Sequence, residues 1–429
     1  MITTEIQLPV MLQAGDPGYD EARTVWNAMI ERRPAVIARC ASTAEVAAAV
    51  RYGRSRSLEI GVRCGGHNIA GLAVPDGGLM IDLTPMGAVR VDPVRRLAWV
   101  QGGALLGELD RAAQEHGLAT TAGNVSHTGV GGLTLGGGMG WLARRYGLAC
   151  DNVVSYEVVT ADGEVVRAAA DENPELFWGL RGGGGNFGIV TSFEFRLHAV
   201  GTSTVVADFA FSADEGFAVL AGWRELSATA PREATFTAYV AGDVVRVGFV
   251  WVGDPVAGAS LLPALRGLGS VVEEDVREMS YLTLQTRDDN VQGHRYRRYW
   301  KGHYFTSLPD EALRALLRNP GIGASLQSYG GAIADVPDAD AAFGHRDTAF
   351  EFVTATRWED PADDAERIAT VRAYAAGLEP YASGAYVNTL NGEPVRRAFP
   401  AAKLARLRAL KTVWDPANVF HLNQNISPS

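Results

Sequence analysis

The spacing of hydrophobic residues predicts that helices and strands alternate through the first half of the chain. Residues 40–63 predict a helix that begins with a capping box of Ser42 and Glu45 and is followed by a strand. Further strands are predicted in 77–83, 87–92, 96–101, 152–168 (a hairpin about Asp162-Gly163) and 188–197. Two further helices are predicted in 104–117, with Leu105, Leu109 and Ala112 inward, and in 173–180, with Pro174 in its first turn.

Past about Leu197 the pattern changes. Alternating strands are predicted in 202–212, 234–241, 244–253 and 350–358, with helical stretches such as 212–226 between them. This order predicts a second layered unit, in which one sheet is covered by helices. The tail 399–420 predicts a helix that ends at Asp415-Pro416, with Leu404, Leu407 and Leu410 inward.

Length, charge and cysteine content narrow the function. A chain of 429 residues exceeds the usual size of a single core, so we expect two domains. Lys and Arg number 39 against 49 Asp and Glu, and the net charge of −10 disfavours a nucleic acid partner. Three cysteines make no disulfide framework, "MITTEIQLPV" lacks the features of a signal peptide, and no apolar run is long enough to span a membrane. We therefore expect a cytoplasmic protein that does not act at a membrane.

Two glycine-rich stretches carry candidate chemistry. Residues 123–140 are "GNVSHTGVGGLTLGGGMG", and 181–188 are "RGGGGNFG". Such density lets backbone N–H groups approach a flat or phosphate-bearing ligand. Gly183-x-Gly185-x-x-Gly188 matches the dinucleotide fingerprint in form, but a helix precedes it and a strand follows, which reverses the Rossmann order. The sequence contains neither a P-loop nor a metalloprotease or EF-hand spacing, so we assign no metal.

His67 follows a glycine pair in "GVRCGGHNIAG", residues 61–71. A glycine pair allows the backbone to approach another group closely. From these residues alone, the imidazole is a candidate base, metal ligand or covalent anchor.

Four segments resemble the berberine bridge enzyme-like group of FAD-linked oxidases, which belongs to the vanillyl-alcohol oxidase superfamily. They are "RCGGHNIAG", "TAGNVSHTGVGGLTLGGGMGWLARRYGLACDNV", "ENPELFWGLRGGGGNFGIVTSFEFRL" and "YVNT…WDPANVFHLNQNI", in the family's order. The resemblance implies an α+β fold: a PCMH-type FAD-binding domain of two α/β subdomains, with an inserted substrate domain of one antiparallel sheet covered by helices. It assigns residues 1–200 to the FAD-binding domain, 201–385 to the substrate-binding domain and 386–429 to a segment that returns to the FAD-binding domain.

The resemblance also implies that FAD is the cofactor and that a ring nitrogen of His67 is bonded to the 8α carbon of the flavin. The residues that it places against the cofactor are Arg63, Gly65, Gly66, His67, Asn68, Gly71, Gly123, Asn124, His127, Thr128, Gly131, Gly132, Gly136, Gly137, Gly140, Trp141, Asp151, Gly188, Ile189, Val190, Asn388, Asn423 and Asn425. For His127, a satisfied imidazole without a cofactor contact is an equally good interpretation.

The sequence departs from the family pattern at several positions. Val125 stands where many relatives have a cysteine that forms a second bond to the flavin, so we expect a single link. Leu133, Met139 and Thr389 replace a histidine and two tyrosines that are frequent in plant relatives. Thr128 occupies the position that controls oxygen access, which leaves open whether the protein is an oxidase or a dehydrogenase.

Tyr386 and Asn388 are candidate catalytic residues. "SGAYVNT" predicts a strand on which both share the face toward the flavin, while Thr389 points away. Because an unperturbed tyrosine titrates at about pH 10, Tyr386 needs a nearby positive charge to act as a base, and Lys301 or Arg346 are the candidates.

Glu351 is the competing base. It lies in the apolar strand "AFEFVTA", where burial raises the proton affinity of a carboxylate. A third interpretation makes Tyr386 a packing residue with a satisfied hydroxyl. The nearby run "HRYRRYWKGHY", residues 294–304, is predicted to be a solvated rim, with stacking of an anionic or aromatic ligand as the alternative.

Together these features predict an FAD-linked oxidoreductase that takes a hydride from a C–OH or C–N carbon of a small organic substrate. O₂ is the expected acceptor, and the protein is expected to be a monomer or homodimer. The alternatives are a carbohydrate or 6-hydroxynicotine-type oxidase, and a flavin-loaded binding protein with little turnover.

Overall fold

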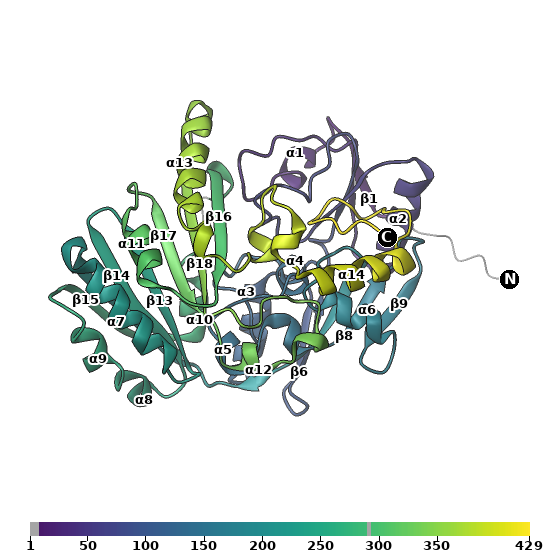
Figure 1. Cartoon of the computed structure of the whole chain (residues 1–429). Helices are drawn as coiled ribbons and strands as arrows, with labels where there is room; N and C mark the ends of the chain where they lie inside the picture. The colour runs from purple at the N-terminus through teal and green to yellow at the C-terminus, as the bar shows by residue number, and fades with distance from the viewer. Residues whose placement is uncertain (1–7, 290–292) are drawn as a thin grey trace.

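Three β-sheets organise the chain. The computed structural model describes residues 8–289 and 293–429, so residues 1–7 of "MITTEIQLPV" lie outside the described part. Within it the strands form a four-stranded, a five-stranded and a seven-stranded sheet, and a short ladder of β7 (Leu118–Ala119) with β11 (His198–Ala199). Figure 1 shows the seven-stranded sheet on one side of the molecule and the two smaller sheets on the other. In this part of the chain no helix has the length and apolar content needed to cross a bilayer.

The four-stranded sheet lies near the amino terminus. Its order is β1 (Val10–Leu12), β2 (Val36–Arg39), β4 (Leu79–Asp82) and β3 (Ile60–Arg63); β1 is antiparallel to β2, and β2, β4 and β3 are parallel. Besides the short α1 (Tyr19–Ala22), α2 (Thr43–Ser55) packs its alanine and valine face into this core. The Ser42 half of the predicted capping box of α2 is confirmed, because Ser42 Oγ accepts from the Glu45 N–H at 3.3 Å, whereas the Glu45 carboxylate accepts from the Ala41 N–H at 2.8 Å and not from that of Ser42.

The five-stranded sheet is antiparallel throughout. Its order is β5 (Val89–Asp92), β6 (Leu97–Gln101), β10 (Ile189–Arg196), β8 (Val153–Val159) and β9 (Val165–Ala169), which confirms the predicted strands and hairpin. The helices of this part are α3 (Leu106–Gln114), α4 (Val130–Leu135), α5 (Ala143–Tyr146) and α6 (Pro174–Leu180). The predicted inner face of α3 is confirmed at Leu109 and wrong at its other two positions, because Leu105 caps the helix and the other buried apolar residues are Leu106 and Ala113.

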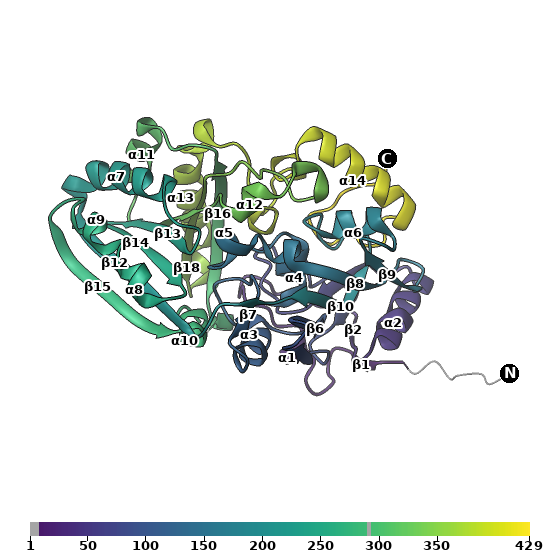
Figure 2. The same cartoon turned by 90° about the horizontal axis from the view of Figure 1, so that it is seen from below.

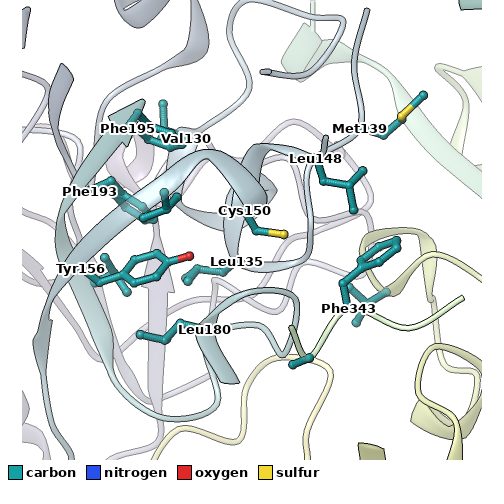
Figure 3. Close-up of a cluster of buried hydrophobic side chains, with 14 of the residues drawn as sticks. Val130, Leu135, Met139, Leu148, Cys150, Tyr156, Leu180, Phe193, Phe195 and Phe343 are labelled. Atoms are coloured by element: carbon teal, nitrogen blue, oxygen red, sulfur yellow. The ribbon is translucent and has the colours of Figure 1, made fainter. Parts of the chain in front are cut away.

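Aromatic side chains of the five-stranded sheet form part of the hydrophobic core beneath it. Figure 3 shows Tyr156, Phe193 and Phe195 projecting from the sheet toward Leu135 and Cys150. Cys150 is fully buried in this core, so it is a packing residue.

The seven-stranded sheet is the antiparallel sheet that the resemblance implied. Its order is β15 (Val271–Ser280), β12 (Ser203–Ser212), β14 (Val244–Val252), β13 (Ala234–Ala241), β17 (Gly323–Ser328), β18 (Phe350–Trp358) and β16 (Arg297–Phe305). Its helices are α7 (Gly216–Ala228), α8 (Pro255–Ala259), α9 (Leu262–Arg266), α10 (Tyr281–Thr286), α11 (Asp310–Leu317), α12 (Ala332–Asp335) and α13 (Asp364–Ala376). Residues from α7, α11 and α13 share one hydrophobic core with the sheet, so these helices cover one face of it.

The predicted solvated rim at 294–304 is wrong. Most of this run is the edge strand β16, in which Arg298, Tyr299 and His303 are buried. Polar groups can be buried in this strand because backbone carbonyls accept their hydrogen bonds. Arg298, for example, donates to the Trp26 and Tyr296 carbonyls at 2.6 and 2.9 Å.

The carboxyl-terminal helix α14 (Ala401–Trp414) packs against α6, far from it in sequence (Figures 1 and 2). Leu404, Leu407 and Leu410 are buried as predicted, and Arg406 pairs with Glu175 of α6 at 2.6 Å. The strands of the seven-stranded sheet all lie between residues 203 and 358. The division into residues 1–200, 201–385 and 386–429 itself stays a prediction.

Candidate functional site

A cavity of about 470 Å³ is lined by residues from all three sheets and from the carboxyl-terminal tail. The loop after β3, the glycine-rich loop before and within α4, and the segment leading into β10 form much of its wall. Glu351 of β18 and Trp300 of β16 come from the seven-stranded sheet, and Phe420 and Gln424 come from the tail. We call this space the first cavity.

The glycine pair before His67 has a packing reason. A Cβ on Gly65 would collide with the backbone nitrogen of Gly129, so the two loops can touch only without a side chain there. Gly66 has φ of +70°, a conformation that favours glycine. The pair therefore turns the chain from β3 into the first cavity and presents the imidazole.

The His67 imidazole is held on two sides. Its Nε2 lies 2.7 Å from His127 Nδ1, its Nδ1 lies 3.5 Å from Thr128 Oγ1, and its ring stacks on Trp26 with centroids 4.8 Å apart. Burial, with the His127 and Arg298 charges as smaller contributions, lowers the pKa of His67 to about 3. Burial also lowers the pKa of His127. Both rings are therefore neutral at pH 7, so one of the two facing nitrogens donates the proton that the other accepts.

The wall of the first cavity fits a flat cofactor. Gly132 and Gly185 line it, and a Cβ on either would meet no atom within 4 Å, so the backbone there faces open space. Gly188 also lines it, and a Cβ there would lie 2.5 Å from Val158. The buried Asn423 Oδ1 accepts no hydrogen bond from the described residues. Bare backbone and an unused amide acceptor are the groups that a ring system with N–H and carbonyl edges requires.

Glu351 is the carboxylate of this site. Its neighbours in β18, Phe350 and Phe352, belong to the helix-covered core, and the alternation of a strand turns Glu351 to the opposite face. Its Oε2 accepts from the Tyr329 hydroxyl at 2.6 Å, while its Oε1 accepts from none of the described residues. Burial raises the pKa of Glu351 to about 7, against the opposing effect of the Tyr329 hydrogen bond.

The predicted strand at Tyr386 is wrong. Residues Val387–Thr389 form a 3₁₀ turn, so Tyr386, Asn388 and Thr389 all line the first cavity. The Tyr386 hydroxyl accepts from the Gly138 N–H at 2.9 Å and from Asn388 Nδ2 at 2.8 Å. A tight turn replaces the strand because Thr389 bonds back to the Tyr386 carbonyl, through its N–H at 3.0 Å and its hydroxyl at 2.9 Å.

Neither of the two cations proposed as the positive charge beside Tyr386 is paired with it. Lys301 pairs with Glu393, and Arg346 pairs with Asp151 at 2.7 Å. Burial, aided by the Glu351 charge, instead raises the pKa of Tyr386.

The predicted cofactor residues divide into two groups. Those that line the first cavity are Gly65, Gly66, His67, Asn68, Thr128, Gly131, Gly132, Gly188, Ile189, Val190, Asn388 and Asn423. Those that do not reach its wall are Arg63, Gly71, Gly123, Asn124, His127, Gly136, Gly137, Gly140, Trp141, Asp151 and Asn425.

Residues in the second group have other partners. Arg63 donates to the Ala22 carbonyl at 3.1 Å, and Asn124 donates to Gln327 at 3.1 Å. Gly140 lies so close to the Ala122 carbonyl that no side chain fits. His127 reaches the site indirectly, through its contact with His67.

Trp26 and Trp300 are site residues that the sequence did not reveal. Both line the first cavity, and their rings lie 5.5 Å apart. Trp26 stands in a segment without periodicity, so no local signal marked it, whereas Trp300 stands in the run predicted to be a rim, for which stacking of a ligand was the alternative. No group of three or more His, Cys, Asp or Glu is placed to hold a metal ion in residues 8–289 and 293–429.

Comparison with known proteins extends over the full chain. The family described as "FAD binding domain" matches residues 34–169, and the family described as "Berberine and berberine like" matches 385–427. (R)-6-hydroxynicotine oxidase of Paenarthrobacter nicotinovorans is 30% identical, covering 100% of this chain and 99% of its own. Glucooligosaccharide oxidase of Sarocladium strictum is 29% identical, covering 96% and 91%. The crystal structure of 6-hydroxy-D-nicotine oxidase from Arthrobacter nicotinovorans has a TM-score of 0.89 at 28% identity and covers 100% of both chains.

The two matched segments meet at the first cavity, since the 34–169 match contains His67 and the 385–427 match contains Tyr386 and Phe420. The similarity is therefore more than a shared nucleotide-binding module, because it includes the tail that closes the site. We conclude that this chain belongs to the berberine-like family of FAD-dependent oxidoreductases.

Proposed function

We propose that the protein oxidises a C–OH or C–N carbon of a small neutral or cationic molecule, with FAD bonded to His67 and with Glu351 as the base. When bound, FAD supplies the acceptor for the hydride that leaves the substrate carbon. The observation that carries the proposal is the free Oε1 of Glu351, a buried carboxylate that faces the same cavity as His67. Dioxygen is the proposed final acceptor.

Two features support His67 as the single covalent anchor. A neutral imidazole keeps a lone pair, and His127 occupies Nε2, so Nδ1 is the nitrogen available for a bond to carbon. Val125 lines the first cavity at the position where relatives with two links have a cysteine, and its side chain cannot form a thioether.

Glu351 suits the work of a base better than Tyr386 does. A base acts best when its pKa lies near the working pH, and the pKa of Glu351 is about 7. The Tyr386 phenol has a raised pKa and already accepts two hydrogen bonds. Tyr386 and Asn388 therefore shape the wall, while Glu351 takes the O–H or N–H proton of the substrate.

The charge of the wall limits the substrate. Its lining residues, all within the described part of the chain, include Glu351 but no Lys or Arg, so an anionic substrate group beside Glu351 would meet a like charge and no counter-ion. Trp26 and Trp300 offer apolar ring faces to the substrate. An amine or an alcohol on an apolar or aromatic skeleton fits this wall, and the 6-hydroxynicotine oxidase relative supports it.

Carbohydrate oxidation is a second candidate. Trp300 is half-buried at the first cavity, and indole faces are suited to stacking against sugar rings. The glucooligosaccharide oxidase relative supports this alternative.

Anaerobic mixing with a panel of amines, alcohols and sugars tests the proposal. A substrate bleaches the flavin absorbance before air is admitted, and the rate depends on its concentration. Bleaching by dithionite but by no member of the panel would favour a flavin-loaded binding protein instead.

A further inference from the structure

A second cavity, of about 580 Å³, lies where α5 meets the seven-stranded sheet. Its wall comes from α5, from the end of α7, and from the loops that follow β16 and β17. Both views place α5 beside α12, at the junction of the two halves (Figures 1 and 2). Tyr329 belongs to this wall, while its hydroxyl reaches Glu351 at the first cavity.

Arg144 gives this cavity a buried positive charge without a counter-ion. The residue is 7% exposed and forms no ion pair with any described carboxylate. It donates to the backbone carbonyl of Tyr329 and, at 3.1 Å, to that of Ala230, while its Nε has no acceptor. Buried charges are normally paired, because carbonyl dipoles alone recover only part of the lost hydration.

The charged neighbours do not supply the missing anion. Arg232 is the charged group that most affects Arg144, and it is another cation, paired with Asp335. Burial and this neighbour together lower the pKa of Arg144. Arg224 also lines the cavity, but its charge is met by Asp310 at 3.0 Å.

The wall also carries several donors without a partner, beside apolar side chains such as Leu308, Pro309 and Phe350. The N–H groups of Gly330 and Gly331, whose φ values are +80° and +57°, donate to no acceptor in the described chain. The hydroxyls of Thr306 and Ser307 have no partner there either. A Cβ on Gly330 would lie 3.8 Å from Arg144 Nη1, so this glycine lies beside the guanidinium, but its N–H points away because the Tyr329 carbonyl of the same peptide group accepts from Arg144. No Asp or Glu lines this cavity, as far as the structure describes the chain.

We propose that the second cavity binds a small oxyanion, a phosphate or a carboxylate group, at the Arg144 guanidinium. A guanidinium binds the oxygens of such anions with charge-assisted hydrogen bonds. The site is separate from the first cavity, where no Lys or Arg is among the described lining residues. It therefore serves a ligand other than the substrate of the proposed oxidation.

Titration calorimetry of the FAD-loaded protein with inorganic phosphate and with acetate tests the site, at constant ionic strength held with sodium chloride. The loaded protein is used so that phosphate does not enter the cofactor site. We expect saturable binding of at least one anion, and we expect Arg144→Gln to weaken it roughly tenfold or more, which corresponds to about 1.4 kcal/mol.

A second pair of variants keeps the test valid if Arg144→Gln does not fold. Ala228 is exposed at the end of α7 and lines the second cavity. Ala228→Glu places a negative charge there and should weaken anion binding several-fold, whereas Ala228→Gln, of the same size but uncharged, should leave it unchanged. Absence of saturable binding in the unmodified protein, or equal binding in both Ala228 variants, would overturn the proposal and leave Arg144 a purely structural link between α5 and the sheet.

Discussion

His67 and His127 face each other across a 2.7 Å contact between Nε2 and Nδ1, and Trp26 stacks on the His67 ring. Two tautomers satisfy this contact. Only the one in which His67 Nε2 carries the proton leaves a lone pair on His67 Nδ1 for a bond to carbon. Through this contact, His127 of the glycine-rich loop influences which nitrogen of His67, in the loop after β3, is available for the proposed bond to the flavin.

Substitution of the proposed anchor should release the cofactor. We expect His67→Ala to lose all flavin colour from the acid-precipitated protein, whereas the unmodified protein stays yellow. Peptide mass spectrometry should find the flavin mass on the His67 peptide. A flavin mass on Cys64 or Cys150 would contradict the single histidyl link.

The partner histidine should affect attachment more than binding. In His127→Leu, no acceptor holds the proton on His67 Nε2, so we expect a smaller fraction of FAD to survive acid precipitation at equal total FAD. His127→Gln can still accept from Nε2 and should restore part of that fraction. Equal covalent fractions in all three proteins would show that His127 does not select the tautomer.

Two variants distinguish the candidate bases. Glu351→Gln should slow anaerobic flavin reduction by about 100-fold or more, because general base catalysis contributes at least that much. Tyr386→Phe should reduce at a rate near that of the unmodified protein, while losing about 1–3 kcal/mol of stability because the Gly138 N–H and the Asn388 amide lose their acceptor. The reverse order of rates would assign the base to Tyr386.

The Tyr329 hydrogen bond offers a control for this assignment. Tyr329→Phe removes the donor that opposes the raised pKa of Glu351. The pH at which flavin reduction reaches half its maximum should therefore move upward. An unmoved pH profile would mean that Glu351 is not the group titrating in it.

The buried Asp110 carboxyl should make the free energy of unfolding depend on pH. It is fully buried, accepts from Gln285 at 2.9 Å and has a pKa raised by burial to about 7. The unfolded chain releases this proton at about pH 4, so between about pH 4 and 7 the folded state binds more protons, and stability falls as the pH rises. Each pH unit in this window lowers the free energy of unfolding by up to about 1.4 kcal/mol. Urea unfolding should show a flatter slope in Asp110→Asn, and an unchanged slope would count against the buried, protonated carboxyl.

Removal of the tail should open the first cavity. Phe420, Asn423 and Gln424 line it, and Leu407 of α14 is fully buried in the core that contains α6. A chain ending at Tyr386 should therefore fail to retain FAD in gel filtration. Arg408→Ala, on the exposed side of α14, should retain FAD normally. Normal retention by the truncated chain would refute the discontinuous FAD-binding domain.

Local sequence was sufficient for elements whose signals are short-range. The Ser42 cap, the alternation of β10 and the leucine face of α14 each depend on residues within a few positions, and each was predicted correctly. The family motifs likewise identified the FAD-dependent class, because close contacts between backbones require glycines, and these form a dense pattern of fixed order in the sequence.

Tertiary structure decided what depends on distant partners. Charge and aromatic content predicted a rim at 294–304, yet carbonyls from Trp26 and Tyr296 allow Arg298 to lie buried in β16. Alternation placed Thr389 away from Tyr386, but a turn held by the Tyr386 carbonyl brings both to the first cavity. Lys301 and Arg346 form ion pairs with Glu393 and Asp151, and the spacing of residues along the sequence does not reveal these partners. Periodicity records which face of an element is buried, whereas hydrogen-bond and charge partners come from elsewhere in the chain and are set only when the sheets assemble.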